Sequence, residues 1–295
     1  MKIVIYLLLL FCFSFGFSQE ETKPKKKAQK RWQQRYSGGA GTFYLRYGWN
    51  RSWYTKSDLS VWGPGYAFTV KDAVGKDAPA EFSFKKYFSL KTWSIPQFSC
   101  KLGYYFADNW VISIGWDHMK YVLEESTYKF NGFIDSAVYE DWGGTYNDDP
   151  VKTEYEYFHY ENSDGLNYAR VEIHRADQWW REKKGIVAIN TLFGLSTGMM
   201  ITRNDFGIGG LPKKNDFRVS GWGLSAHLGI RIDFVNFLFL QYNFGGGLVH
   251  LPKVNTKVDE PHYARQVFLY GEMDFAFGAF WYITKINRVP AKHIR

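Results

Sequence analysis

The chain has 295 residues, a formal net charge of +8 and an aromatic content of 20%. Much of the positive charge lies in two runs near the ends, 23–31 and 285–295, and we predict no folded basic surface, which argues against nucleic-acid binding. The aromatic content is high for a soluble domain and is typical of proteins that place aromatic side chains at a membrane interface.

The N-terminal segment has the parts of a secretory signal peptide. Lys2 precedes an apolar run from Ile3 to Phe17, and small residues at positions 16 and 18 suit cleavage after residue 18. The run is shorter than the roughly 20 residues that a membrane-spanning helix needs. We therefore predict four regions, which are a signal peptide at 1–18, a basic periplasmic linker at 19–39, a folded region at 40–284 and a basic periplasmic tail at 285–295.

The remainder of the chain offers few covalent or metal-binding constraints. Cleavage would leave Cys100 as the sole cysteine, so the sequence predicts neither a disulfide nor a cysteine zinc site. We also expect no cofactor. No later stretch is apolar for long enough to form a spanning helix, so a mature chain within a membrane would have to cross it as a closed barrel.

Alternation of apolar and polar residues predicts eight long strands after residue 40. The clearest example is the hairpin 219–250, in which two alternating runs flank a short turn at Val235 and Asn236. Strand four is the weakest, because Arg175 and Asp177 fall on its otherwise apolar face. A tilted strand needs about 9–11 residues to cross a bilayer, and these runs are long enough. The predicted strands are 41–54, 93–106, 110–123, 166–180, 186–200, 219–234, 237–250 and 265–283.

The predicted connections alternate between short and long. Those after strands two, four and six are short. The long ones include 55–91, which we predict to be irregular, and 124–165, a second long insertion rich in Tyr, Asn and acidic residues. Such alternation is typical of outer-membrane barrels, with turns in the periplasm and loops outside. The mature chain resembles the small outer-membrane β-barrel class of Gram-negative bacteria, whose members include adhesins, envelope anchors, small-solute channels and lipid A-modifying enzymes. The resemblance is one of architecture and carries over no functional residue.

The fold prediction is an all-β, closed, antiparallel, up-and-down transmembrane β-barrel of eight strands at 40–284, in the cell outer membrane. Its long loops are extracellular, its short turns are periplasmic, and both termini are periplasmic. A soluble lipocalin-like barrel is the rival, but its lumen would have to hold ring after ring of Trp, Phe and Leu. The expected barrel is a monomer that contacts outer-membrane lipid and lipopolysaccharide. An extracellular or periplasmic protein is a further possible partner, and nucleic acid is not.

The polar face of each strand must point into the lumen if the apolar face meets lipid. This inward face carries four cations and four acids. The strand order places Arg46 near Glu272 and Asp274, and Lys101 at the height of Asp117. An eight-stranded barrel has room for side chains and little else, and an unpaired buried ion costs several kcal/mol. We therefore predict a plug of salt bridges. Its members are Arg46, Lys101, Asp117, Arg170, Glu172, His174, His227, Arg231, Glu272 and Asp274.

Two further groups of residues are expected at the outside of the cell. His118 and Lys120, near the top of strand three, are candidates for contact with lipopolysaccharide phosphates. The segment 123–165 holds eleven acidic residues against two lysines, and carboxylates with asparagine and carbonyl oxygens suit calcium. The spacing is not that of an EF-hand, and a solvated acidic surface, or one that recognises protein or glycan through its tyrosines, is the alternative. The candidate cation ligands are Asp148, Asp149 and Asp164.

The predicted function is a structural or surface-binding role, without catalysis. Two alternatives stay open. A narrow conduit through the polar lumen would make the protein a channel for small polar or amphipathic solutes. The lumenal His174, His227 and Ser225 are residue types of a hydrolase that could deacylate lipid A, although His174 is placed towards the periplasmic end of the barrel.

Overall fold

The computed structural model describes residues 36–89, 91–92, 96–210, 213–258 and 261–283. The chain has two units, residues 1–30 and 31–295, and the described residues all belong to the second. The predicted signal peptide, most of the basic linker and the basic tail lie outside the described residues. No helix in the described part is long and apolar enough to cross a membrane.

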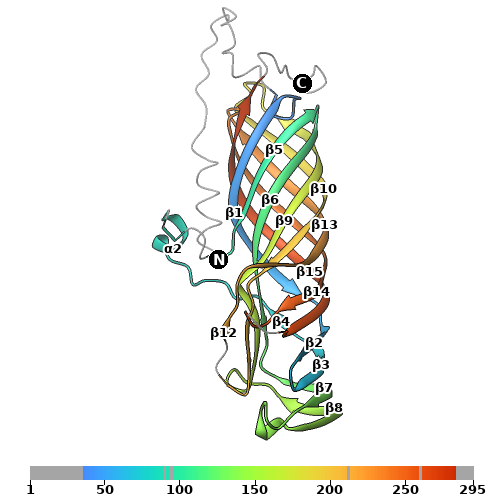
Figure 1. Ribbon diagram of the computed structural model, residues 1–295. Helices are drawn as coiled ribbons and strands as arrows, with labels where there is room; N and C mark the ends of the chain where they lie inside the picture. Colours follow the sequence, from blue (N-terminus) through green and yellow to red (C-terminus); the bar gives the residue numbers. More distant parts are fainter. Residues whose placement is uncertain (1–35, 90, 93–95, 211–212, 259–260, 284–295) are drawn as a thin grey trace, which may run out of the picture. The chain divides into compact units, whose positions relative to one another are not determined.

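Eight long strands form a ring in which each strand pairs with two neighbours (Figure 1). Every pair is antiparallel, and β1 closes the ring by pairing with β15 over 13 positions, from Thr42 opposite Tyr282 to Tyr54 opposite Tyr270. The predicted eight-stranded, antiparallel, up-and-down β-barrel is thus confirmed. Its strands are β1 (Thr42–Tyr54), β5 (Ser99–Ala107), β6 (Trp110–Leu123), β9 (Phe158–Arg181), β10 (Val187–Thr202), β13 (Arg218–Phe234), β14 (Leu238–Asn255) and β15 (Tyr263–Tyr282).

Large apolar side chains are exposed on the outer face of every ring strand, while their neighbours in sequence are buried and mostly polar. A soluble barrel would show the reverse arrangement, so the lipocalin-like alternative is excluded. The apolar belt is the surface that a transmembrane β-barrel presents to lipid. Examples from the eight strands are Leu45, Leu102, Ile114, Val171, Leu195, Leu228, Leu240 and Phe277.

The predicted hairpin turn between β13 and β14 is present at Val235 and Asn236. Both residues have positive φ, 47° and 55°, as a type I′ turn requires. This conformation is strained for a β-branched residue such as valine. Neighbouring turns hold it in place, because the Val235 N–H donates to the Ile186 carbonyl (2.7 Å) and the Asn236 side chain accepts from Arg181 (2.9 Å).

The insertion 55–91 contains strands and a short helix, so the prediction that it is irregular was wrong, and the insertion 124–165 contains strands as well. β2 pairs with the N-terminal part of β15, β3 with β2, β7 with β3, and β8 with β7, so the sheet continues beyond the ring. We call β2, β3, β7 and β8 the loop-end sheet, and we call the end of the ring that it joins the loop end. The elements of the insertions are β2 (Ser57–Gly63), β3 (Tyr66–Ala73), β4 (Gly75–Lys76), α2 (Phe84–Phe88), β7 (Thr127–Ile134), η2 (Glu140–Trp142) and β8 (Gly144–Lys152).

Two smaller differences concern the ring itself. β9 begins at Phe158, so it starts before the predicted 166 and carries the sheet further past the loop end. The predicted loop 204–218 contains β11 (Asp205–Ile208), which pairs with this extension of β9, and β12 (Lys213–Lys214), which pairs with β11. The extra strands were missed because each is too short to show a long alternating run.

Apolar side chains fill the interior at both ends of the ring. At the loop end, side chains of β6, β9, β14 and β15 pack with those of the loop-end sheet, and the stacked pairs Phe68–Phe130 and Tyr121–Phe268 lie 5.0 and 5.2 Å apart between ring centroids. We call this cluster the loop-end core. At the opposite end, where the short turns lie, a second cluster forms, which we call the turn-end layer. Its members are Tyr44, Tyr105, Val111, Ala176, Leu192, Phe239 and Phe280.

Candidate functional site in the barrel lumen and at the loop end

The ten residues predicted for the lumen are all buried. They lie on the inward face of their strands. Arg231 packs within the turn-end layer, and the other nine lie between that layer and the loop-end core. The inward side chains of β9 show the order of these layers, because they run from Tyr168 of the loop-end core through Arg170, Glu172 and His174 to Ala176 of the turn-end layer. The lumen is therefore a charged middle zone enclosed by apolar side chains on both sides.

The seam between β1 and β15 holds the first group of charges. The Arg46 guanidinium contacts the Asp274 carboxylate at 2.6 Å, as strand adjacency predicted. Asn243 of β14 also donates to Asp274, at 3.0 and 3.1 Å. Glu272 accepts a hydrogen bond from the Asn50 amide at 2.7 Å. Its partner on β1 is therefore neutral, whereas the prediction had placed Glu272 near Arg46.

The second group lies across β5, β6 and β9, and its pairing differs from the prediction. Lys101 contacts Glu172 at 2.5 Å, and Asp117 contacts Arg170 at 2.6 Å. The prediction placed Lys101 beside Asp117, but each of them pairs with a residue of β9 instead. β9 lies next to β6 and supplies one charge to each. Arg170 also lies 3.9 Å from Glu272 and so joins the two groups into one network.

A fifth lumenal acid, Asp233, was missing from the predicted charge balance of four cations and four acids. It contacts Arg231 at 2.7 Å and accepts from Asn190 at 2.9 Å. Arg231 lies within the turn-end layer, where its guanidinium carbon is 4.9 Å from the centroid of the Phe280 ring, a cation–π contact. Asp233 shares the inward parity of Arg231 on β13, so the same alternation could have identified it.

The lumenal histidines gather around one carboxylate. His174 Nδ1 lies 3.0 Å and His227 Nε2 lies 3.7 Å from Glu172 Oε1. The Ser225 hydroxyl bonds with Ser196 (2.6 Å) and accepts from Arg170. A Ser–His pair that could act as a nucleophile and base is therefore not formed among the described residues, and the alternative of a lipid A hydrolase gains no support from this group.

Two residues, His118 and Lys120, were predicted to contact lipopolysaccharide, and the surroundings of His118 do not suit that role. The His118 ring is 7% exposed. It stacks against Phe98 with the centroids 5.6 Å apart, and its Nδ1 lies 2.8 Å from the Asn167 side-chain oxygen. A ring held in this way has little surface for a lipid phosphate, so its assignment is corrected. Lys120 remains a prediction.

The three predicted cation ligands of the loops do not come together. Asp148 accepts from Asn131 at 2.5 Å, and Asp149 accepts from the Asn147 N–H at 2.8 Å, both within the β7–β8 hairpin. Asp164 lies on β9 and contacts Lys214 at 2.6 Å. Burial alone would raise the pKa of Asp164, but the adjacent Lys214 ammonium holds it below its usual range. The calcium site was predicted from residue types alone. The sheet order separates β8, which carries Asp148 and Asp149, from β9, which carries Asp164.

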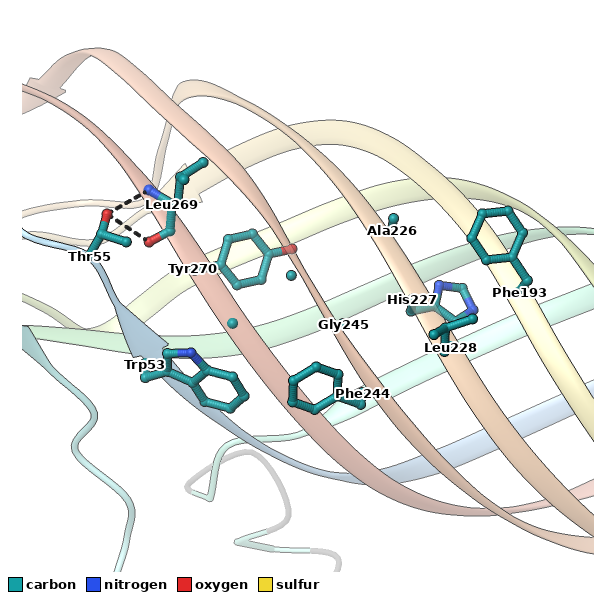
Figure 2. Close-up of a pocket in the computed structure, with 12 residues that line it drawn as sticks. Trp53, Thr55, Phe193, Ala226, His227, Leu228, Phe244, Gly245, Leu269 and Tyr270 are labelled. Atoms are coloured by element: carbon teal, nitrogen blue, oxygen red, sulfur yellow. Dashed lines mark hydrogen bonds between the residues drawn. The ribbon is translucent and has the colours of Figure 1, made fainter.

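An apolar groove of about 540 Å³ opens on the wall formed by β10, β13, β14 and β15 (Figure 2). Phe193, Leu228, Phe244 and Leu269 line it from the lipid-facing side. Its floor contains the glycines at 245, 246 and 271, where the absence of side chains thins the wall. A Cβ added at Gly271 would lie 2.0 Å from the Trp53 indole. The lining suits hydrocarbon, so we expect a lipid chain to occupy this groove.

No protein-family model and no curated protein sequence matches the chain. Among solved structures, it is similar to Ail, the attachment invasion locus protein of Yersinia pestis, at 12% identity and a TM-score of 0.33, over 82% of this chain and 99% of that one. It is also similar to Neisserial surface protein A (11%, TM-score 0.35, 81% and 98%) and to the outer membrane protein OprG from Pseudomonas aeruginosa (10%, TM-score 0.33, 85% and 99%). The ring of eight antiparallel strands with an apolar outer face is by itself the architecture of a transmembrane β-barrel. The identities are too low to carry over a ligand or a site residue.

Proposed function

We propose that this protein is a non-enzymatic outer-membrane barrel that acts as a closed anchor and presents the loop-end sheet for binding outside the cell. The observation that supports a closed barrel is the arrangement of its interior in layers. The charged residues of the middle zone are paired with one another, and aromatic side chains pack above and below them. A hydrated ion would have to lose most of its water to pass these two closely packed layers, which costs free energy.

Ion conduction tests the closed barrel directly. We expect the full-length protein, reconstituted in a planar bilayer, to show no current steps above those of the lipid alone. A porin of known conductance, inserted in the same bilayer, is the control for the assay. Steps from the wild-type protein whose size changes in Arg46→Ala would contradict the proposal and would favour a narrow channel.

The binding role is supported by the surface of the loop end. Phe133 on β7, with Tyr155 and Tyr157 before β9, are exposed aromatic residues in a segment, 123–165, that holds eleven acidic residues against two lysines. Amphipathic aromatic side chains are enriched where proteins bind one another, and an acidic surface favours a basic partner. We therefore propose an extracellular protein partner with a basic contact surface.

Photocrosslinking in intact cells tests this partner. A photoreactive phenylalanine at position 133 is expected to yield a discrete protein adduct, since this side chain is exposed on the loop-end sheet. The same residue at position 106, which replaces a lipid-facing Phe106 on β5, is the matched control and should yield none. An absence of protein adducts at positions 133, 155 and 157 alike would contradict a surface-binding role.

A further inference from the structure

One histidine and two carboxylates meet where β9 extends beyond the ring, beside β11. Glu161 of β9 lies directly opposite Asp205 of β11 in the antiparallel pair. His159 is two residues from Glu161 and therefore shares its face of the sheet. The cross-strand neighbour of His159 is Gly207, which has no side chain to fill the space. One ligand atom from each of the three side chains lies within 4.8 Å of the others.

The charges of this group are not balanced by the cations of the same region. Carboxylates directly opposite each other on paired strands repel, as Glu161 and Asp205 must when both are ionised. Lys214 is the cross-strand neighbour of Asp205, but its ammonium pairs with a third acid, Asp164, at 2.6 Å, as the Arg203 guanidinium does at 3.7 Å. Two cations therefore face three carboxylates. A cation between the two facing carboxylates would remove their repulsion.

His159 is held in place but lacks a hydrogen-bond partner on its ring. Its side chain is 7% exposed and packs against Tyr155, with the ring centroids 4.4 Å apart. Nε2 lies 3.1 Å from Glu161 Oε2 without the alignment of a hydrogen bond, and neither Nε2 nor Asp205 Oδ1 has a hydrogen-bond partner. Buried polar atoms without partners cost free energy, and coordination of a metal ion would satisfy both.

The surroundings of the group leave access for an ion and for its remaining ligands. A cavity of about 160 Å³ borders His159 and Glu161 and is also lined by Glu124 and Glu125. Since a water molecule occupies roughly 30 Å³ in the liquid, the cavity holds several.

Burial raises the pKa of Asp205 above its usual value. Burial alone would also raise the pKa of Glu161, but the adjacent His159 and Ser163 hold it lower.

We propose that His159, Glu161 and Asp205 bind a divalent transition-metal ion, for which Zn²⁺ is the best match. Imidazole nitrogen together with carboxylate oxygen is a usual zinc donor set, and three protein ligands leave one position open. Calcium takes six to eight oxygen ligands, and this group supplies two carboxylates and a nitrogen. The cavity borders His159 and Glu161, so water or a donor from a bound partner could reach the open position. The site does not depend on the partner proposed above.

Calorimetric titration of the tag-free, full-length protein in detergent micelles with ZnCl₂ tests the site. We expect one Zn²⁺ per chain, with affinity at least about tenfold weaker in His159→Gln and in Asp205→Asn, since even groups that only orient metal ligands contribute 10–100-fold. His250→Gln, which alters a partly exposed histidine on β14, should bind like the wild type. Co²⁺ should give a visible absorption band that Asp205→Asn removes.

Several results would overturn the proposal. One is the absence of stoichiometric Zn²⁺ binding by the wild-type protein, and another is equal binding by the wild type and the two site variants. Binding that survives His159→Gln but is lost in His227→Gln would place the ion at Glu172 in the lumen. Tighter binding of CaCl₂ than of ZnCl₂ would contradict the choice of metal. Circular dichroism confirms that each variant is folded, and Asp205→Asn, at a half-buried position, keeps the test valid if His159→Gln does not fold.

Discussion

Replacement of Arg170 by methionine is expected to destabilise the barrel by about 3–5 kcal/mol, because it leaves a fully buried partner charge without its cation. Arg170 contacts Asp117 at 2.6 Å and lies 3.9 Å from Glu272. Both acids are enclosed between the loop-end core and the turn-end layer, so water cannot replace the lost partner. The measurement is the free energy of unfolding from urea titration in lipid vesicles.

Two companion variants make this result specific. Lys71→Met removes an ion pair with Asp58 that is exposed on the loop-end sheet, and it should leave the free energy of unfolding nearly unchanged, because exposed ion pairs contribute little. Asp117→Asn in the Arg170→Met background should recover part of the lost stability, because the uncompensated charge is then gone. Equal effects of Arg170→Met and Lys71→Met would mean that the middle zone is hydrated, and the closed barrel would be wrong.

Replacement of Leu228 by arginine is expected to cost about 2–4 kcal/mol of folding free energy, the range for a cation at the bilayer midplane on the lipid face of a barrel. Leu228 is 61% exposed on β13. Trp222 and Phe234 lie near the two ends of that strand, and Leu228 lies midway between them. We therefore expect Leu228 at the centre of the bilayer. The measurement is the same unfolding titration in vesicles.

The matched control lies on the same strand and is equally exposed. Val219, 62% exposed at the loop end of β13, should tolerate arginine at a cost of about 0–1 kcal/mol, because a charge near the interface reaches water. The comparison separates the effect of depth from that of the substitution. Equal costs at positions 219 and 228 would show that the belt does not lie in a bilayer.

Much of the barrel could be predicted because its strands are long. Over a dozen residues, a period of two leaves no doubt about which side chains share a face, and this placed Arg46, Glu172 and Asp274 inside and Leu228 outside. The turn at Val235 and Asn236 followed from the break in that period. The short strands of the insertions were missed for the same reason, since Leu59 and Val61 of β2 span too few residues to stand out from a loop.

Pairing could not be predicted in the same way. Parity assigns a residue to a face, but the partner of a charge depends on the stagger between strands, which is set by the closure of the ring and by bulges such as those between Met119 and Tyr121. Lys101 therefore meets Glu172 and not Asp117. The group formed by His159, Glu161 and Asp205 also escaped notice, because its members come from β9 and from a short strand in a predicted loop.

The sequence by itself determined the eight alternating strands and which of their side chains face outwards, because one face of each strand is apolar and the other is mostly polar or small. The tertiary structure alone decided that aromatic layers lie on both sides of the lumenal charges and that the insertions continue the sheet. Layers and cross-strand neighbours arise from residues far apart in the chain, and only the register of the closed ring brings them to the same height.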